Sequence, residues 1–346
     1  MTIGSTASTH VVVGKGPVGT ATAQALLDGG HRVRLLSRSG GIPSDLHTAG
    51  AEDRIEAAAA DASDAASLVA ASAGALTIYN CLNPDYHRWV TDWPPMATAL
   101  LDAAEAHDAG YVIMGNLYGY GPASLHGRPD GAGYDAAHPM TADLPLATTG
   151  TKGAVRAAMW EQALDRQRAG RVRVTEARAS DFYGPLVVEG GYLGERTVPA
   201  VLAGRRPQLV GDPSRPHSFT YIPDVGRALA TLGTDDRSWG RPWHVPTAPA
   251  LSMQQMVDRM CDLAGVDRVR ARVIPHLAIR GAGLFVPFMR ELEEVRYQFT
   301  EPFVLDSTDF TSTFGWSATD VDDAVTATIG WWRARLQTGA PAPAAA

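Results

Sequence analysis

The chain has 346 residues, of which 45% are hydrophobic and 19% charged, a composition typical of a folded globular protein. Acidic residues number 37 and basic residues 30, and the resulting net charge of −7 argues against binding to nucleic acid or to an anionic membrane. The chain has no apolar run of ~18 residues that could span a bilayer and its start does not resemble a signal peptide, so we expect a cytoplasmic protein.

The first half of the sequence alternates between strand and helix patterns. Each apolar, β-branched run is followed by a segment with helical spacing, a rhythm typical of a parallel sheet with helices on both faces. We predict strands at 10–13, 33–36, 53–59, 75–79, 111–114 and 171–178, and helices at 20–28, 64–72, 95–107 (begun by Pro94 and Pro95) and 150–169.

After about residue 185 this rhythm weakens, and short segments rich in glycine and proline take over. We therefore predict a doubly wound Rossmann domain over 1–185, a smaller substrate lobe over 186–336 and a flexible tail over 337–346. Some sheet and helix elements return to the first domain from 215–250. Helices in the second half are expected at 193–203, 224–232, 252–264 and 320–336.

A glycine-rich loop, GKGPVG, lies between the first strand and the first helix. Gly14, Gly16 and Gly19 occupy the three glycine positions of a dinucleotide-binding turn, with Pro17 and Val18 between them. These glycines permit a tight turn, close approach of the backbone to a pyrophosphate, and close packing of helix on strand. The following helix N-terminus presents free N–H groups to the phosphates.

The end of the second strand indicates which dinucleotide is bound. NAD sites usually have an acidic residue there for the ribose hydroxyls, whereas this chain has Ser37, Arg38 and Ser39. An arginine can pair with a 2′-phosphate, and serines can donate to it. The sequence therefore favours NADP(H), with NAD(H) as the alternative.

Taken together, these features resemble the short-chain dehydrogenase/reductase superfamily, in its extended and atypical branch of epimerases and dehydratases. The resemblance extends over roughly 10–335. It rests on the glycine loop, on Asp61, on the segment YNCLN at 79–83, on MGNLYGYG at 114–121, on ARASDFYGP at 177–185 and on HSFTYIPDVGRAL at 217–229.

The resemblance assigns further binding residues. It implies that the cofactor also contacts Asp61, Asn80, Leu82, Ser180 and Lys152. It places the following side chains near the substrate: Asn83, Tyr120, Asp181, Phe182, His217 and Tyr221.

The catalytic positions depart from the family pattern. Lys152 matches the family's lysine, but Thr148 stands four residues earlier where the family has tyrosine, and Asn116 stands at the serine position. Threonine does not titrate near neutral pH and cannot simply replace tyrosine as a general acid. Three interpretations stay open: Tyr118, Tyr120 or Tyr183 supplies the proton, water or an ordered network supplies it, or redox chemistry has been lost.

The leading functional prediction is an NADP(H)-dependent oxidoreductase acting on a carbonyl or alcohol of a small organic or sugar-like metabolite. The alternatives are a redox-neutral sugar-nucleotide epimerase or dehydratase, and a non-catalytic NADP-binding regulator. Lack of an HExxH pair, a GxSxG elbow and a GxxxxGK[ST] loop argues against a metal site, a hydrolase and an NTPase. We expect Cys81 and Cys261 to be free buried thiols, and the chain to form a homodimer.

Overall fold

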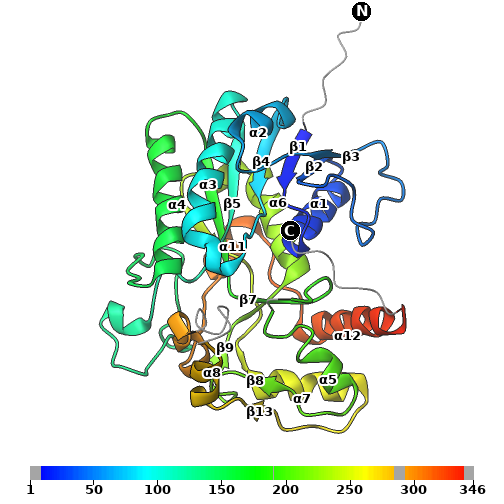
Figure 1. The fold of residues 1–346 in the computed structure, drawn as a ribbon, viewed down its shortest axis with the longest axis vertical. Coiled ribbons are helices and arrows are strands. Elements are labelled where there is room, and N and C mark those ends of the chain that lie inside the picture. Colours follow the sequence, from blue (N-terminus) through cyan, green and yellow to red (C-terminus); the bar gives the residue numbers. More distant parts are fainter. Residues whose placement is uncertain (1–8, 190, 284–292, 339–346) are drawn as a thin grey trace, which may run out of the picture.

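A seven-stranded parallel sheet forms the centre of the larger lobe in the computed structural model, which describes residues 9–189, 191–283 and 293–338 (Figure 1). Every neighbouring pair in this sheet is parallel, and the order reverses direction at the first strand. The order is β3 (Ile55–Ala59), β2 (Arg32–Ser37), β1 (Thr9–Val13), β4 (Ala75–Asn80), β5 (Gly110–Asn116), β6 (Val174–Ala179) and β11 (Pro242–His244). This is the predicted doubly wound Rossmann fold.

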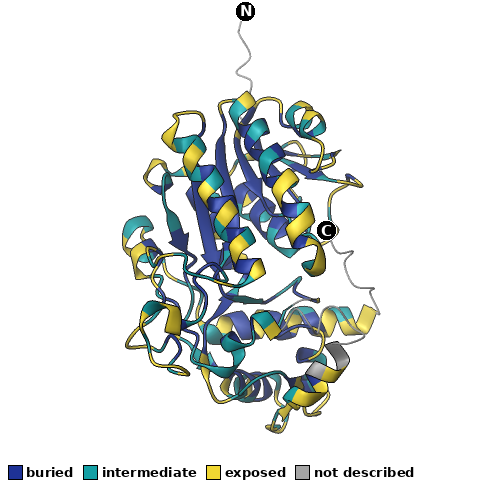
Figure 2. Cartoon of the chain, turned by 60° about the vertical axis from the view of Figure 1, so that its left-hand side comes forward, coloured by how far each residue is buried: buried dark blue, intermediate teal, exposed yellow. Residues whose placement is uncertain are grey.

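Helices cover both faces of the sheet. Successive side chains of a strand point to opposite faces, so Val11 and Val13 enter one core while Val12 enters the other. Figure 2 shows the central strands of the sheet largely buried and the exposed residues on the outer sides of the helices. One face packs on α2 (Ala65–Ala71), α3 (Trp89–Ala106) and α4 (Thr151–Arg168), and the other on α1 (Pro17–Asp28), α6 (Ile222–Thr234) and α11 (Thr308–Phe314).

The smaller lobe lies beyond the carboxyl ends of the strands and has its own apolar core (Figure 1). Its helices are α5 (Val198–Leu202), α7 (Met253–Ala264), α8 (His276–Gly283), α10 (Tyr297–Thr300) and α12 (Val321–Thr338). Short strand pairs join its loops: β7 (Asp181–Tyr183) with β10 (Phe219–Tyr221), β8 (Gln208–Leu209) with β13 (Arg272–Val273), and β9 (Pro216–His217) with β12 (Leu251–Ser252).

Two predicted helices differ from those observed. The helix predicted to begin at Pro94 and Pro95 instead begins at Trp89, and both prolines lie inside α3. Trp89 and Trp93 are buried in a cluster with Met159, and with this packing the helix begins nearly two turns earlier than predicted in spite of the prolines. The helix predicted over 193–203 is reduced to α5, since a turn around Gly194 precedes it.

Three further predictions concern cysteines, the tail and membrane spans. Cys81 and Cys261 are both buried and free, as expected. The predicted tail begins inside α12, which continues to Thr338, and residues 339–346 lie outside the described part. Within the described residues, no helix is long and apolar enough to cross a membrane.

Candidate active site

A cavity of about 370 Å³ lies at the carboxyl edge of the sheet, between the two lobes. The ends of four strands contribute to it: Gly16 after β1, Leu82 after β4, Asn116 at the end of β5 and Ser180 after β6. The carboxyl edge at the reversal of strand order is where ligands bind in open α/β sheets. The cavity therefore extends from the glycine loop to the smaller lobe without a break.

The glycine loop has the backbone geometry that its sequence requires. Gly14 has a φ of +110°, and a Cβ on it would lie 2.7 Å from the carbonyl oxygen of Cys81. A Cβ on Gly19 would lie 1.9 Å from the carbonyl oxygen of Gly14, so helix and loop touch through bare backbone. Gly16 is the N-cap of α1 and no side chain caps this helix end. The loop and the uncapped helix N-terminus thus fit a pyrophosphate.

The residues predicted to select the cofactor lie at the carboxyl end of β2, beside the glycine loop and outside the cavity lining. Arg38 and Ser39 are exposed and Ser37 is half-buried. Sequence reasoning missed Lys15, whose Nζ donates to Ser39 Oγ at 2.7 Å and to the carbonyl oxygen of Gly40 at 2.8 Å. Two cations therefore flank the end of β2.

Asp61 and Asn80, which were also predicted to contact the cofactor, form hydrogen bonds within the protein. Asp61 accepts hydrogen bonds from the N–H and Oγ of Ser63, and the backbone bond is the larger cause of its lowered pKa. Asn80 is buried below the cavity floor, donating to Tyr111 Oη and accepting from the N–H of Leu82. Asn80 thereby fixes the backbone that positions Leu82 in the cavity wall.

Among the predicted catalytic residues, Asn116 and Tyr118 line the cavity. Asn116 Oδ1 accepts from the N–H of Tyr118 at 3.1 Å, which fixes the turn after β5. The Tyr118 hydroxyl hydrogen-bonds the hydroxyl of Tyr86, and burial raises the pKa of both tyrosines. Tyr118 is thus a protonated phenol in the wall of the cavity.

Thr148 and Lys152, the other two residues at predicted catalytic positions around α4, lie outside the cavity. Thr148 lies just before α4, and its Oγ1 accepts from the N–H of Gly150 at 3.1 Å. Lys152 is buried in the first turn, with Nζ 3.6 Å from Glu294 Oε2 and 5.1 Å from the centre of the Tyr86 ring. Neither Thr148 nor Lys152 belongs to the cavity lining.

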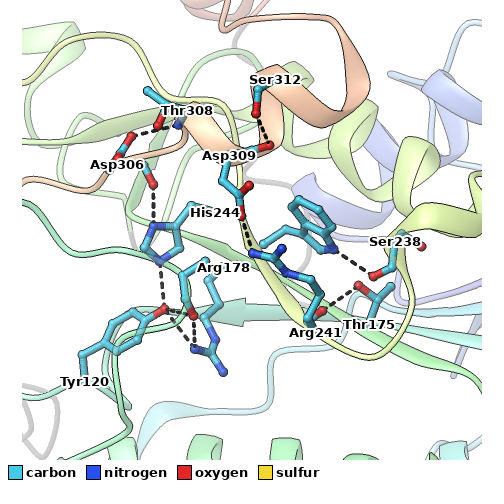
Figure 3. A network of polar contacts seen from close by, with 12 residues as sticks. Tyr120, Thr175, Arg178, Ser238, Arg241, His244, Asp306, Thr308, Asp309 and Ser312 are labelled. Atoms are coloured by element: carbon cyan, nitrogen blue, oxygen red, sulfur yellow. Dashed lines mark hydrogen bonds and ion pairs between the residues drawn. The ribbon is translucent and has the colours of Figure 1, made fainter.

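Two predicted tyrosines are part of the protein interior. Tyr120 Oη contacts His244 and Arg178 in a buried network, which Figure 3 shows in close-up. Tyr183 packs against Tyr221, with ring centres 5.5 Å apart, in the core of the smaller lobe. These three tyrosines lie outside the cavity lining, as does His217.

Another part of the cavity is formed by the loop after β4 and by strand β7. Asn83, Asp181 and Phe182, which were predicted to contact substrate, line the cavity there; their contact with substrate stays a prediction. Asp181 Oδ2 lies 2.7 Å from Nε2 of His217, which is buried directly behind it. The cavity wall therefore has a carboxylate backed by an imidazole.

Arg156 was missed by sequence reasoning, although it stands four residues after Lys152 and so on the same helix face. Its guanidinium lies over the rings of Trp89 and Trp93, at 4.6 and 4.5 Å, and NH1 donates to the carbonyl oxygen of Met114. Nε is buried without a hydrogen-bond partner, and burial lowers the pKa of the group. Arg156 lines the cavity and brings a positive charge to it.

Comparisons with known proteins connect this fold to sugar-nucleotide enzymes. No family model and no curated protein sequence matches the chain. Among solved structures, a dTDP-glucose 4,6-dehydratase from Bacillus anthracis in complex with NAD has a TM-score of 0.72 at 13% identity, covering 96% of this chain and 98% of the other. A UDP-glucose 4-epimerase from Thermotoga maritima with UDP-glucose has a TM-score of 0.71 at 14% identity, covering 95% and 99%.

A nucleoside-diphosphate-sugar epimerase from Pseudomonas aeruginosa gives a similar result, with a TM-score of 0.69 at 20% identity and coverage of 94% and 98%. The chain thus has, over nearly its whole length, the fold of these solved epimerases and dehydratases. Within the described residues, no group of three potential ligands could hold a metal ion.

Proposed function

We propose that this protein is an enzyme that binds a nicotinamide dinucleotide and acts on a hydroxyl-bearing carbon of a sugar-like substrate. The observation that carries this proposal is the single cavity of about 370 Å³ that joins the glycine loop to Asn116, Tyr118 and Asp181. A dinucleotide on the loop would extend toward these polar side chains, which can bind or exchange a proton with a substrate oxygen.

The type of reaction that we place first is a redox-neutral epimerisation or dehydration of a sugar nucleotide. Sequence reasoning alone placed a net NADP(H)-dependent oxidoreductase first. The solved structures of similar fold are described as epimerases and dehydratases, which supports the redox-neutral alternative better. In such a cycle the dinucleotide supplies a hydride acceptor that later returns the hydride.

The chain's own residues divide into three groups in this proposal. The glycine loop and the N-terminus of α1 bind the pyrophosphate, and Leu82 and Ser180 flank the nicotinamide end. Asn116 and Tyr118 orient the substrate oxygen. Lys152 lies over the ring of Tyr86, whose hydroxyl is bonded to that of Tyr118, and so supports Tyr118 from behind the cavity wall. The remaining groups receive the substrate: Asn83, Asp181 and Phe182.

For the cofactor we propose a preference for the 2′-phosphorylated dinucleotide. Lys15, Arg38 and two serines surround the end of β2, and no acidic side chain stands at 37–39 to bind a free ribose hydroxyl pair. The solved structures cited above include NAD complexes, so this preference rests on residues of this chain alone.

A binding experiment tests the cofactor proposal. Tryptophan fluorescence titrations should show NADPH binding at least about tenfold more tightly than NADH. Lys15→Ala and Arg38→Ala should each weaken NADPH binding about tenfold, equivalent to about 1.4 kcal/mol, and leave NADH binding unchanged. Exposed Arg205, at the end of α5, gives a matched control as Arg205→Ala. Equal or tighter binding of NADH would overturn the preference.

A turnover experiment separates the three classes of function. With a panel of sugar nucleotides, an epimerase or dehydratase changes the sugar without net change in the absorbance of reduced nicotinamide. A net oxidoreductase changes that absorbance in proportion to product. A non-catalytic regulator is stabilised against heating by the dinucleotide yet converts nothing, and that result would contradict the enzymatic proposal.

A further inference from the structure

Asp181 and His217 form a buried pair at the substrate end of the cavity. Asp181 begins β7 and lines the cavity with 19% of its side chain exposed. His217 ends β9 and lies behind it, with 7% of its side chain exposed. Asp181 Oδ2 lies 2.7 Å from His217 Nε2, so a residue in the wall is coupled to one that solvent scarcely reaches.

The hydrogen bonds of His217 require an additional proton. Nδ1 lies 3.0 Å from the backbone carbonyl oxygen of Gln298, which can only accept, so Nδ1 donates. A neutral imidazole then has a bare Nε2, and this nitrogen would face a carboxylate that also can only accept. A good hydrogen bond at 2.7 Å therefore needs one proton more than a neutral ring and a carboxylate provide.

Aromatic packing fixes the ring in this position. The His217 ring is stacked on Phe299 and Phe303, with centres 5.9 and 5.3 Å away, and contacts Phe219 at 4.7 Å. These rings restrict access of water to the imidazole and hold Nε2 toward Asp181. The second carboxylate oxygen of Asp181 takes no part in the bond to His217.

The titratable groups facing the pair are tyrosines. Among the described residues, those whose ionisation the Asp181 carboxylate influences are Tyr86, Tyr118 and Tyr192, from the loop after β4, the loop after β5 and the loop before α5. Burial is the largest cause that raises the pKa of each. They stay protonated near neutral pH, so they are not the proton acceptors of this region. The carboxylates in the cavity lining are those of Asp85, Asp181 and Glu189, and Asp181 is the one that is hydrogen-bonded to buried His217.

Building on the function proposed above, we propose that Asp181 accepts the proton of the substrate hydroxyl and that doubly protonated His217 positions it for this task. The substrate O–H bond breaks and its proton passes to the free oxygen of Asp181. A bound oxidised dinucleotide would supply the acceptor for the hydride of the adjacent C–H bond, so that the C=O bond forms as the proton passes to Asp181. Return of hydride and proton reverses the step, so Asp181 ends each cycle as a carboxylate.

This assignment explains how the site functions without the family's helix tyrosine. Thr148 is turned to the N–H of Gly150 and lies outside the cavity, so it is not available to the substrate. Tyr118, as a protonated phenol, can donate a hydrogen bond to the same substrate oxygen but is a poor proton acceptor. A base in the wall opposite completes the pair of groups that alcohol oxidation needs.

NMR of the histidine ring nitrogens tests the proton count without any substrate. Protein with isotope-labelled histidine, saturated with NADPH or NADH, should show both nitrogens of His217 protonated near neutral pH. Asp181→Asn should convert His217 to a neutral ring protonated at Nδ1 alone. His217→Gln identifies the signal, and His138 beside Asp135 is an exposed comparison pair. A neutral His217 in the unmodified protein would overturn the inference while leaving the proposed function intact.

Kinetics test the catalytic role separately. Asp181→Asn should lower kcat about 100-fold or more with unchanged dinucleotide affinity and melting temperature, and Asp181→Glu should recover part of it. His217→Gln should lower kcat less and shift the pH profile, as expected of a positioning residue. If the unmodified protein converts no substrate, the function proposal fails and the NMR result still decides the pair. Full activity of Asp181→Asn would overturn the catalytic role.

Discussion

Two buried histidines, His244 and His217, have the same partner type at Nδ1 but different partners at Nε2. His244 and His217 both donate Nδ1–H to a backbone carbonyl, of Asp306 and Gln298 respectively. Nε2 of His244 meets the hydroxyl of Tyr120, which can donate to it, whereas Nε2 of His217 meets the carboxylate of Asp181. A neutral ring satisfies the first environment and a charged ring the second.

The networks around the two histidines also differ in how completely they are closed. Around His244, the Tyr120 hydroxyl bonds the imidazole and the Arg178 guanidinium at 2.9 Å each, outside the cavity lining (Figure 3). Arg178 in turn donates to the carboxylate of Glu176 at 2.6 Å. The cavity lining that contains Asp181, the partner of His217, also contains Arg156 Nε and Ser180 Oγ, which are buried without hydrogen-bond partners. Unused hydrogen-bonding capacity beside a cavity, rather than buried charge itself, distinguishes the candidate site.

The largest loss of stability is expected from removing the Glu176 carboxylate from the network around His244. Glu176 and Arg178 are almost fully buried and 2.6 Å apart, so Glu176→Gln leaves a buried guanidinium without its counter-ion. The free energy of unfolding should fall by about 3–5 kcal/mol in urea denaturation. Asp165→Asn breaks the exposed pair with Arg168 and should cost about 0–1 kcal/mol. A loss below about 1 kcal/mol for Glu176→Gln would show that the network is not closed as described.

The next effect is a loss of stability in acid that comes from His244. Burial lowers its pKa to about 4, whereas the unfolded chain has the ordinary value of 6.5. The unfolded state therefore binds protons first, and stability that is present above about pH 6.5 is lost as pH falls toward 4. The contribution is of order 3 kcal/mol.

His244→Gln provides the measurement of that contribution. The variant should have a flatter dependence of unfolding free energy on pH over this window, although it is less stable at neutral pH. His10, whose pKa burial also lowers to about 4, should account for much of the slope that persists. An unchanged slope in His244→Gln would show that folding does not lower the pKa of His244.

The comparison also shows what the sequence could predict. The fold and the glycine loop were predictable because they depend on local patterns: strand and helix periodicity, and glycines that a Cβ would exclude from Gly14 and Gly19. The position of Lys152 in the first turn of α4 was equally local. Its partner Glu294 was not, because the two meet only after the smaller lobe folds back on the first.

The composition of the cavity wall was predicted only in part for the same reason. Asn116, Tyr118 and Asp181 were identified because the family resemblance places functional residues in the segments around the ends of β5 and β6. Tyr120 and Tyr183 were equally good candidates in sequence, yet the structure turns both into the interior. Whether such a side chain faces the cavity depends on long-range packing, here on His244 and Tyr221, which no spacing rule encodes.

The smallest effect, and the sharpest comparison, comes from two tyrosines two residues apart. Tyr120→Phe removes the hydroxyl that His244 and Arg178 share and should cost about 1–2 kcal/mol of stability without lowering turnover of the folded enzyme. Tyr118→Phe removes a hydroxyl bonded to Tyr86 at the cavity wall and should cost less than about 1 kcal/mol, but should lower kcat about tenfold or more. Thermal unfolding and initial rates on the same two preparations measure both quantities. If Tyr120→Phe lowers kcat as much as Tyr118→Phe does, the prediction is wrong. The Tyr120 network would then act on the reaction, although it has no contact with the cavity.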